Sequence, residues 1–86
     1  MHDLLSRVEA VVSMASGGAV SVEKLHAAKG DLISAGMDSM KILTVIMRLE
    51  AEFGVVIDMN EDASFLQNTA TIAEFVQVQL ALEVVA

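Results

Sequence analysis

The chain lacks cysteine, proline, tryptophan and tyrosine, and each absence narrows what a protein of 86 residues can be. Without cysteine there are no disulfides and no thiolate metal site, which fits an intracellular protein. Its three aromatic residues are all phenylalanine, so platforms for stacking nucleic-acid bases are missing. No apolar run approaches the roughly 18 residues of a membrane span, and the N-terminal residues have no signal-peptide layout. We expect a cytoplasmic protein that does not enter membranes.

Basic residues are also scarce, with 5 against 12 acidic ones and a formal charge of −7 at pH 7. This charge repels the phosphates of nucleic acids, and no basic stripe offsets the repulsion. The acidity fits either plain solubility or steering onto basic protein partners, and composition does not decide between them. A chain this short forms one domain, so we expect a single, monomeric domain over residues 1–86.

Glycines, rather than prolines, separate the segments with helical periodicity. Apolar residues recur at helical spacing from Leu4 to Ala15, and Gly17-Gly18 would stop this first helix. Residues 17–38 then form an unusually long connection. Within it, Ser21 would cap a short helical stretch that ends at Gly30. Leu32 and Ile33 are expected to anchor the rest of the loop to the core.

The second half predicts two further long helices. One runs from Ser39 to Phe53 with Gly54 as its stop, and a shorter turn follows near residues 60–66. The last begins around residues 69–71, where Thr71 and Glu74 have the spacing of a capping box. Strand signals are weak. We therefore predict an all-α fold, a small four-helix bundle with three longer helices, one short helix and a long loop between helices one and two.

The helix predicted over residues 39–53 has two apolar faces. At about 100° per residue, one face forms a normal core stripe made of Ile42, Val45, Ile46, Leu49 and Phe53. A second, narrow line consists of Met40, Leu43 and Met47. Ser39 and Glu50 lie on the same side as this line. Either the helix is buried on two sides under the long loop, or the line, with Glu50, is an exposed strip for partners.

Gly36-Met37-Asp38-Ser39-Met40 marks the start of that helix. A hydroxyl in the first turn faces the positive end of the helix dipole, where an attached phosphate is favoured. Gly36 leaves room for the backbone of a modifying enzyme, and Asp38 supplies an acid that a metal or a basic group can contact. The simpler interpretation is that Asp38 or Ser39 only caps the helix.

The segment DLISAGMDSMKILTVIMRLEAEFGVVI resembles the acyl and peptidyl carrier proteins, in which a Gly-x-Asp-Ser-Leu motif opens a helix. Here the motif reads Gly36 to Met40, preceded by Asp31-Leu32 and followed by Phe53-Gly54 at similar spacing. The later stretch from Phe65 to Val76 is similar to the family's short third helix and the start of its fourth. The resemblance covers nearly the whole chain from Asp31 onward.

This resemblance implies a carrier that catalyses nothing itself. Ser39 would carry a 4′-phosphopantetheine arm, transferred from coenzyme A by a magnesium-dependent phosphopantetheinyl transferase that Asp38 contacts. Met40, Leu43 and Met47 match positions that meet partner enzymes. Those partners would be an acyl- or aminoacyl-loading enzyme and downstream synthases or transferases, with cargo held as a thioester on the arm.

The sequence departs from the family at a few positions. Met40 replaces the usual leucine, a swap that conserves volume. Lys41 and Arg48 stand where fatty-acid carriers are usually acidic. These charges disfavour service to a fatty-acid synthase, so we favour a dedicated carrier in a polyketide, nonribosomal-peptide or related specialised pathway.

Other sites are less well supported by the sequence. Residues 58–62 alternate acceptors as a calcium loop does, but Ala63 and Thr69 replace its glycine and its bidentate glutamate. His2 and His26 lack the spacing of a metal site, and no nucleophile–base pair can be assembled around Ser39. The rival hypothesis is a helical adaptor that is never modified and binds partners through the Met40/Leu43/Met47 line.

Overall fold

A computed structural model describes residues 2–57 and 64–85, and their regular structure is helical. Three longer helices are present, α1 (His2–Ala15), α4 (Ser39–Phe53) and α5 (Thr69–Val85). The shorter elements are α2 (Val22–Ala27), α3 (Leu32–Ala35) and the 3₁₀ turn η1 (Ser64–Gln67). The prediction of a small all-α fold with three longer helices is confirmed.

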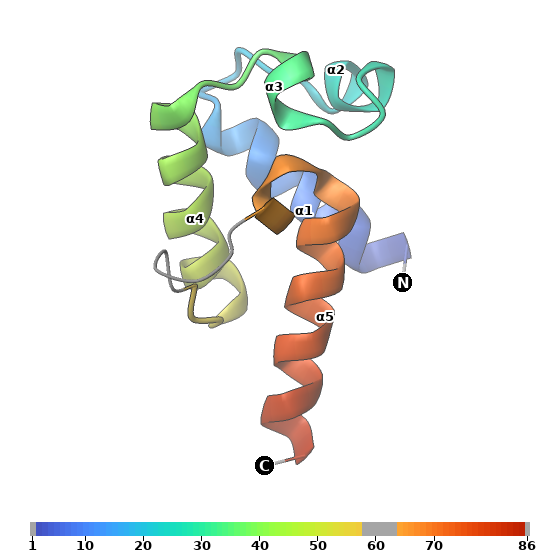
Figure 1. Cartoon of the computed structure of the whole chain (residues 1–86), viewed down its shortest axis with the longest axis vertical. Coiled ribbons are helices and arrows are strands. Elements are labelled where there is room, and N and C mark those ends of the chain that lie inside the picture. Colours follow the sequence, from blue (N-terminus) through green and yellow to red (C-terminus); the bar gives the residue numbers. More distant parts are fainter. Residues whose placement is uncertain (1, 58–63, 86) are drawn as a thin grey trace.

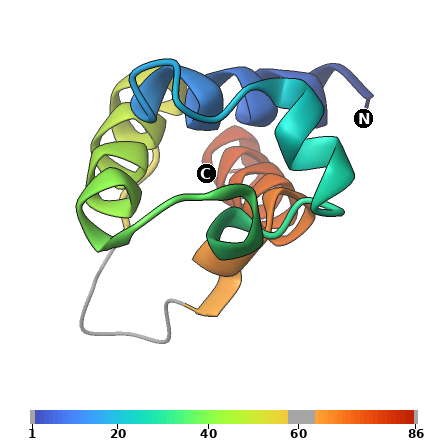
Figure 2. The ribbon, with the colours of Figure 1, turned by 90° about the horizontal axis from the view of Figure 1, so that it is seen from above.

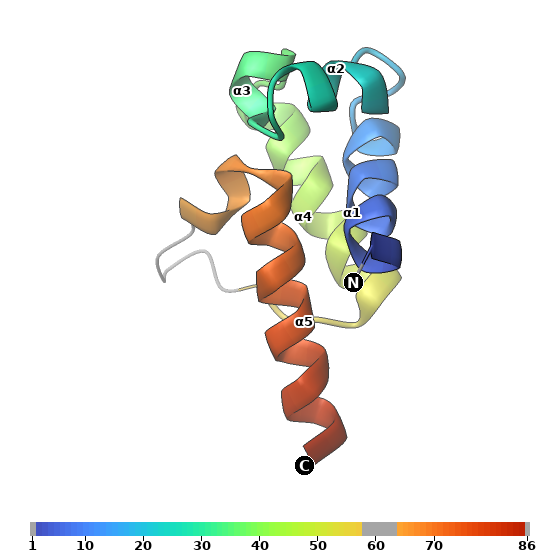
Figure 3. The ribbon, with the colours of Figure 1, turned by 90° about the vertical axis from the view of Figure 1, so that its right-hand side faces the viewer.

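The first helix holds the other two long helices together. α1 packs against both α4 and α5, and Figure 2 shows it running across the molecule beside them. α2 and α3 lie across one end of the long helices (Figure 1), and α5 extends beyond the others at the opposite end (Figures 1 and 3). The long connection between α1 and α4 is therefore a folded layer over one end of the bundle.

The buried side chains form one core to which every helix contributes. The stripe predicted on α4 supplies Val45, Ile46, Leu49 and Phe53, with Ile42 partly buried at its edge. The hydrophobic residues buried in the rest of the described chain are Val8, Val11, Val12, Ala15, Val20, Leu25, Leu32, Met37, Val55, Ile57, Leu66, Ile72 and Val76. The helical periodicity of the apolar residues thus located most of the core.

The long connection contains one more helix than the sequence predicted. Ser21 caps α2 as expected, its hydroxyl accepting the Lys24 N–H at 3.1 Å. α3 follows because the Asp31 side chain accepts from Ser34 N–H at 3.1 Å and Gly36 ends the turn with φ +112°. Leu32 is fully buried as an anchor, but the prediction for Ile33 is wrong, since it is 57% exposed. Neighbouring residues of a helical turn point about 100° apart, and in this single turn Leu32 faces the core while Ile33 faces solvent.

The start of α5 also differs from the prediction. Asn68 is the cap, because its side-chain oxygen accepts the Ala70 N–H at 2.8 Å. Thr71 is instead inside the first turn, where its hydroxyl donates to the Asn68 carbonyl at 2.9 Å. The capping box predicted at Thr71 and Glu74 is therefore wrong, although the predicted start of the helix is right.

The loop between α2 and α3 is fastened to this same end of α5. Thr69 N–H donates to the Gly30 carbonyl at 2.9 Å, and the Asn68 amide donates to the Lys29 carbonyl at 3.1 Å. Gly30 has φ +84°, and a Cβ there would lie 2.6 Å from the Thr69 hydroxyl oxygen. A glycine is needed at this contact for both reasons.

Two predictions fall partly or wholly outside the described residues. The acidic segment 58–62, considered as a calcium loop, lies there entirely, and the turn near residues 60–66 is described only from Ser64 onward as η1. Within the described part of the chain, no helix combines the length and the apolar character needed to cross a bilayer.

Candidate functional site

Three features of the preceding segment place Ser39 at the surface where α4 begins. Gly36 ends α3 in the left-handed conformation, and the chain then turns through Met37, whose side chain is buried in the core. Asp38 follows in extended conformation with φ −112° and ψ 179°, and Ser39 is the first residue of α4. The buried methionine fixes the turn, so the next two side chains point outward and are exposed.

Asp38 is the cap of α4. Its carboxylate accepts the Lys41 N–H at 2.9 Å and lies 3.5 Å from the Lys41 ammonium. The backbone hydrogen bond from Lys41 is the main reason that the pKa of Asp38 lies below its ordinary value, and the Lys41 charge acts in the same direction. The carboxylate is therefore ionised at neutral pH, next to the positive end of the helix.

Because Asp38 fills the capping position, the Ser39 hydroxyl is left without that role. It is exposed and forms no hydrogen bond within residues 2–57 and 64–85. Of the two residues that could cap the helix, Asp38 is the cap and Ser39 is not. A group attached to this oxygen meets open solvent on one side and the N–H groups of the first turn on the other.

No histidine forms a hydrogen bond with this hydroxyl in the described structure. His26 lies on α2, and its ring pairs with the Glu9 carboxylate of α1 at 2.8 Å, with Glu9 itself largely buried. The His2 side chain lies outside the described part. Among the described residues, no group of three or more histidine and acidic side chains could hold a metal ion. The pairing of His26 with Glu9, which links α2 to α1, could not be predicted from the sequence, because residues far apart in the chain carry no local signal.

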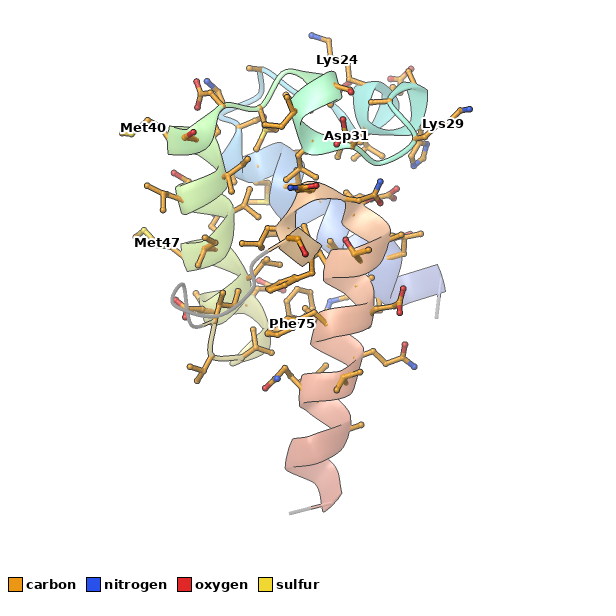
Figure 4. The ribbon with its side chains drawn as sticks, in the orientation of Figure 1. Lys24, Lys29, Asp31, Met40, Met47 and Phe75 are labelled. Carbon is orange, nitrogen blue, oxygen red and sulfur yellow. The ribbon has the colours of Figure 1, made fainter. Side chains whose placement is uncertain are left out.

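The second apolar line of α4 is exposed. Met40 is 74%, Leu43 48% and Met47 68% exposed, and Figure 4 shows both labelled methionines pointing away from the bundle. The alternative that these residues are buried under the long connection is therefore wrong. We call Met40, Leu43 and Met47 the apolar strip; it shares the outer side of α4 with Ser39.

Glu50, which was expected to meet partners on this side of α4, also has a partner within the protein. It is half-buried, and its carboxylate accepts the Ile57 N–H at 3.1 Å, while its carbonyl accepts the N–H of Gly54. Glu50 thereby fastens the segment that follows α4, in which Val55 and Ile57 are buried. The structure gives this side chain an internal partner rather than leaving it free on the strip.

Comparison with known proteins identifies the family. The family model described as a phosphopantetheine attachment site matches residues 19–78. Because this match covers well over half of the 86 residues, the chain belongs to the phosphopantetheine-binding carrier family. No curated protein and no solved structure is similar to it at a significant level.

Membership defines the general chemistry. Proteins of this family carry a covalently attached 4′-phosphopantetheine group and act as carriers without catalysing the reactions of their cargo. They are served by a phosphopantetheinyl transferase and by acyl-processing enzymes. The exposed hydroxyl of Ser39, lying at the positive end of α4 with open surroundings, fits such a group.

Proposed function

We propose that Ser39 is the residue to which the 4′-phosphopantetheine arm is attached, and that the chain is an acyl or aminoacyl carrier. The observation that carries this proposal is the division of roles at the start of α4. Asp38 closes the helix through the Lys41 N–H, which leaves the neighbouring hydroxyl exposed. The match to the family spans this segment.

Each residue of the segment then has a physical role. The Ser39 Oγ would form the phosphodiester, and the N–H groups of the first turn of α4 would stabilise its negative charge. Asp38, ionised beside this oxygen, is the group available to a metal ion or a basic side chain of the transferase. Gly36 is exposed and has no side chain to obstruct that enzyme. When bound, the arm supplies a terminal thiol that holds the cargo as a thioester.

The apolar strip is the surface that we propose for docking of partner enzymes. It begins next to Ser39 and continues for two turns of α4, so an enzyme that covers it has access to the arm. We further propose that the chain works in the cytoplasm, in a specialised polyketide or nonribosomal-peptide pathway. The basic residues Lys41 and Arg48 on α4 support this choice over fatty-acid synthesis.

Intact-mass analysis tests the attachment residue. The protein is incubated with coenzyme A, magnesium and a broad-specificity phosphopantetheinyl transferase, and we expect one added arm. Ser39→Ala should abolish the addition, whereas Ser6→Ala, which removes an exposed hydroxyl from α1, should leave it unchanged. No added mass on the wild-type chain would favour the unmodified adaptor, and addition to Ser39→Ala would move the site elsewhere.

A further inference from the structure

The acidic side chains of α4 and of its cap each interact with another part of the protein. Asp38 accepts the Lys41 N–H, Glu50 accepts the Ile57 N–H, and Glu52 pairs with Arg7 of α1 at 3.4 Å. Each of these carboxylates thus uses part of its hydrogen-bonding capacity within the protein, although Asp38 stays exposed and can still contact a transferase. Although the whole chain is acidic, α4 therefore offers few unpaired carboxylates to a docked protein.

The basic side chains of α4 are not equivalent. Lys41 lies 3.5 Å from the Asp38 carboxylate. Arg48 is exposed and forms no ion pair or hydrogen bond within the part of the chain that the structure describes. Glu52, one turn further along, could pair with it but contacts Arg7, which also lies over the Phe53 ring at 4.7 Å. Arg48 is therefore the basic side chain of α4 that has no partner among the described residues, and its five N–H donors are available to a docked protein.

Arg48 is exposed on α4, about 100° around the helix from Met47 in the apolar strip and about 13 Å along the axis from Ser39 at about 1.5 Å per residue. It also lines a small groove of about 140 Å³ between α1 and α4, together with Val11, Met14, Ala51 and Glu52. Met14 is 61% exposed, so the groove offers an apolar contact near Arg48. Beside Arg48 there is space for the end of a side chain from a docked protein.

We propose that the partner surface that docks on the apolar strip is itself apolar and carries a carboxylate that pairs with Arg48. This proposal rests on the proposed function, since it names the chemistry of the enzyme surface that reads the carrier. A guanidinium binds a carboxylate with two parallel hydrogen bonds. A basic docking surface, which the charge of −7 attracts from a distance, meets Arg48 as a like charge on contact.

A pair of helical peptides tests this proposal on the full-length protein. Each has about 16 residues, long enough for helix formation, with leucines on one face. In the first peptide glutamates flank the leucines, and in the second every glutamate is replaced by lysine. Each is titrated into ¹⁵N-labelled protein, and the amide shifts of residues 40–48 are followed. Arg48→Gln is compared with Lys29→Gln, because Lys29 is exposed and lies on the opposite side of the molecule from Met40 and Met47 (Figure 4).

We expect the glutamate peptide to bind α4 about three-fold more tightly than the lysine peptide, in the range of a single exposed ion pair. Arg48→Gln should remove this preference, and Lys29→Gln should keep it. The proposal is overturned if the lysine peptide binds α4 equally well or better, if neither peptide shifts residues 40–48, or if Arg48→Gln keeps the preference. Neither peptide needs the arm, so these results are separate from the mass test of Ser39.

Discussion

At the scale of single residues, the start of α4 shows how two adjacent polar side chains come to have different roles. The sequence located both, since an acid and a hydroxyl at the start of an amphipathic helix predict a cap. It did not say which of them caps. That depends on the turn before α4, where the buried Met37 and the extended Asp38 direct one carboxylate onto the Lys41 N–H. The hydroxyl that follows is exposed as a result.

Asp38→Asn separates the charge of this cap from its hydrogen bond. Asparagine also caps helices well, so we expect a fold like that of the wild type and little change in stability at pH 7. The folded-state pKa of Asp38 lies below the ordinary value of 3.8. Its ionisation therefore contributes stability above pH 3.8, and this contribution is lost as the pH falls through the lower folded pKa.

The measurement is the difference in Tm between wild type and Asp38→Asn, followed from pH 7 to strongly acidic pH. Any advantage of the wild type should shrink on acidification. In the transfer assay, the same variant should slow addition of the arm if Asp38 contacts the transferase. A wild-type advantage that grows as the pH falls would contradict the assigned direction of the pKa.

Gly30 is the residue at which the α2–α3 loop most closely approaches α5. An alanine Cβ would lie 2.6 Å from the Thr69 hydroxyl and 2.8 Å from the Asn68 side-chain oxygen, at φ +84°. We expect Gly30→Ala to destabilise the protein by about 2–4 kcal/mol, since steric overlap adds to the cost of a left-handed alanine. Urea unfolding measures this loss.

Gly17→Ala is the matched control for this effect. Gly17 has a similar φ of +70°, but an added Cβ there meets nothing within 4 Å. Its cost should be limited to the backbone term, about 1 kcal/mol. Equal losses at the two positions would show that the contact with Asn68 and Thr69 adapts without cost.

At the scale of elements, the sequence predicted the three long helices well because their apolar periodicity is a local signal, as are the glycines that end the first two. It missed α3, although the spacing of Asp31, Ser34 and Gly36 contains a cap and a stop for one helical turn. It misplaced the cap of α5, because Asn68 and Thr71 are both residue types that cap helices and Thr71 also has Glu74 at capping-box spacing. Only the contact of the α2–α3 loop with Asn68 distinguishes them, and that contact joins residues far apart in the chain.

The two apolar faces of α4 make opposite predictions for substitution. Leu49 is fully buried, so Leu49→Ala should cost about 2–5 kcal/mol as a cavity mutation. Leu43 is 48% exposed, so Leu43→Glu should change stability by no more than about 0.5–1 kcal/mol. If the apolar strip serves docking, Leu43→Glu should nevertheless slow addition of the arm by the transferase.

Thermal unfolding and the rate of arm addition are measured for both variants, with Thr44→Glu as the control. Thr44 is also exposed on α4 but is not part of the strip. Unfolding caused by Leu43→Glu would mean that the strip belongs to the core. An equal slowing by Thr44→Glu would show an effect of charge alone rather than the loss of an apolar contact.

At the scale of the whole molecule, the sequence correctly predicted an all-α chain of the carrier family. The absence of cysteine also excluded disulfides and thiolate metal sites. The sequence could not predict which acidic side chains are paired within the fold and which are available to a partner. Within the described structure, two of the acidic groups associated with α4 lie beside basic side chains, Asp38 beside Lys41 and Glu52 beside Arg7. The net charge of −7 is a property of the chain, whereas the charge that a docked protein meets is a property of one face.

Screening of this net charge should stabilise the fold. With 12 acidic and 5 basic residues, like-charge repulsion opposes the compact state and is weakened by salt. We expect Tm to rise by roughly 3 °C between 20 and 200 mM KCl, equivalent to about 0.5 kcal/mol. Lys29→Glu makes the chain more acidic and should steepen this rise. A Tm that falls with added salt would show that attractive ion pairs outweigh the repulsion.

The hydrogen bond from Lys41 N–H to Asp38 has a consequence for the proposed attachment of the arm to Ser39. Derivatising the adjacent Ser39 oxygen breaks no hydrogen bond in the part of the chain that the structure describes. If Ser39 carries the arm as proposed, the forms with and without it can therefore share one backbone. A partner enzyme that distinguishes the two forms would then have to contact the arm or its cargo.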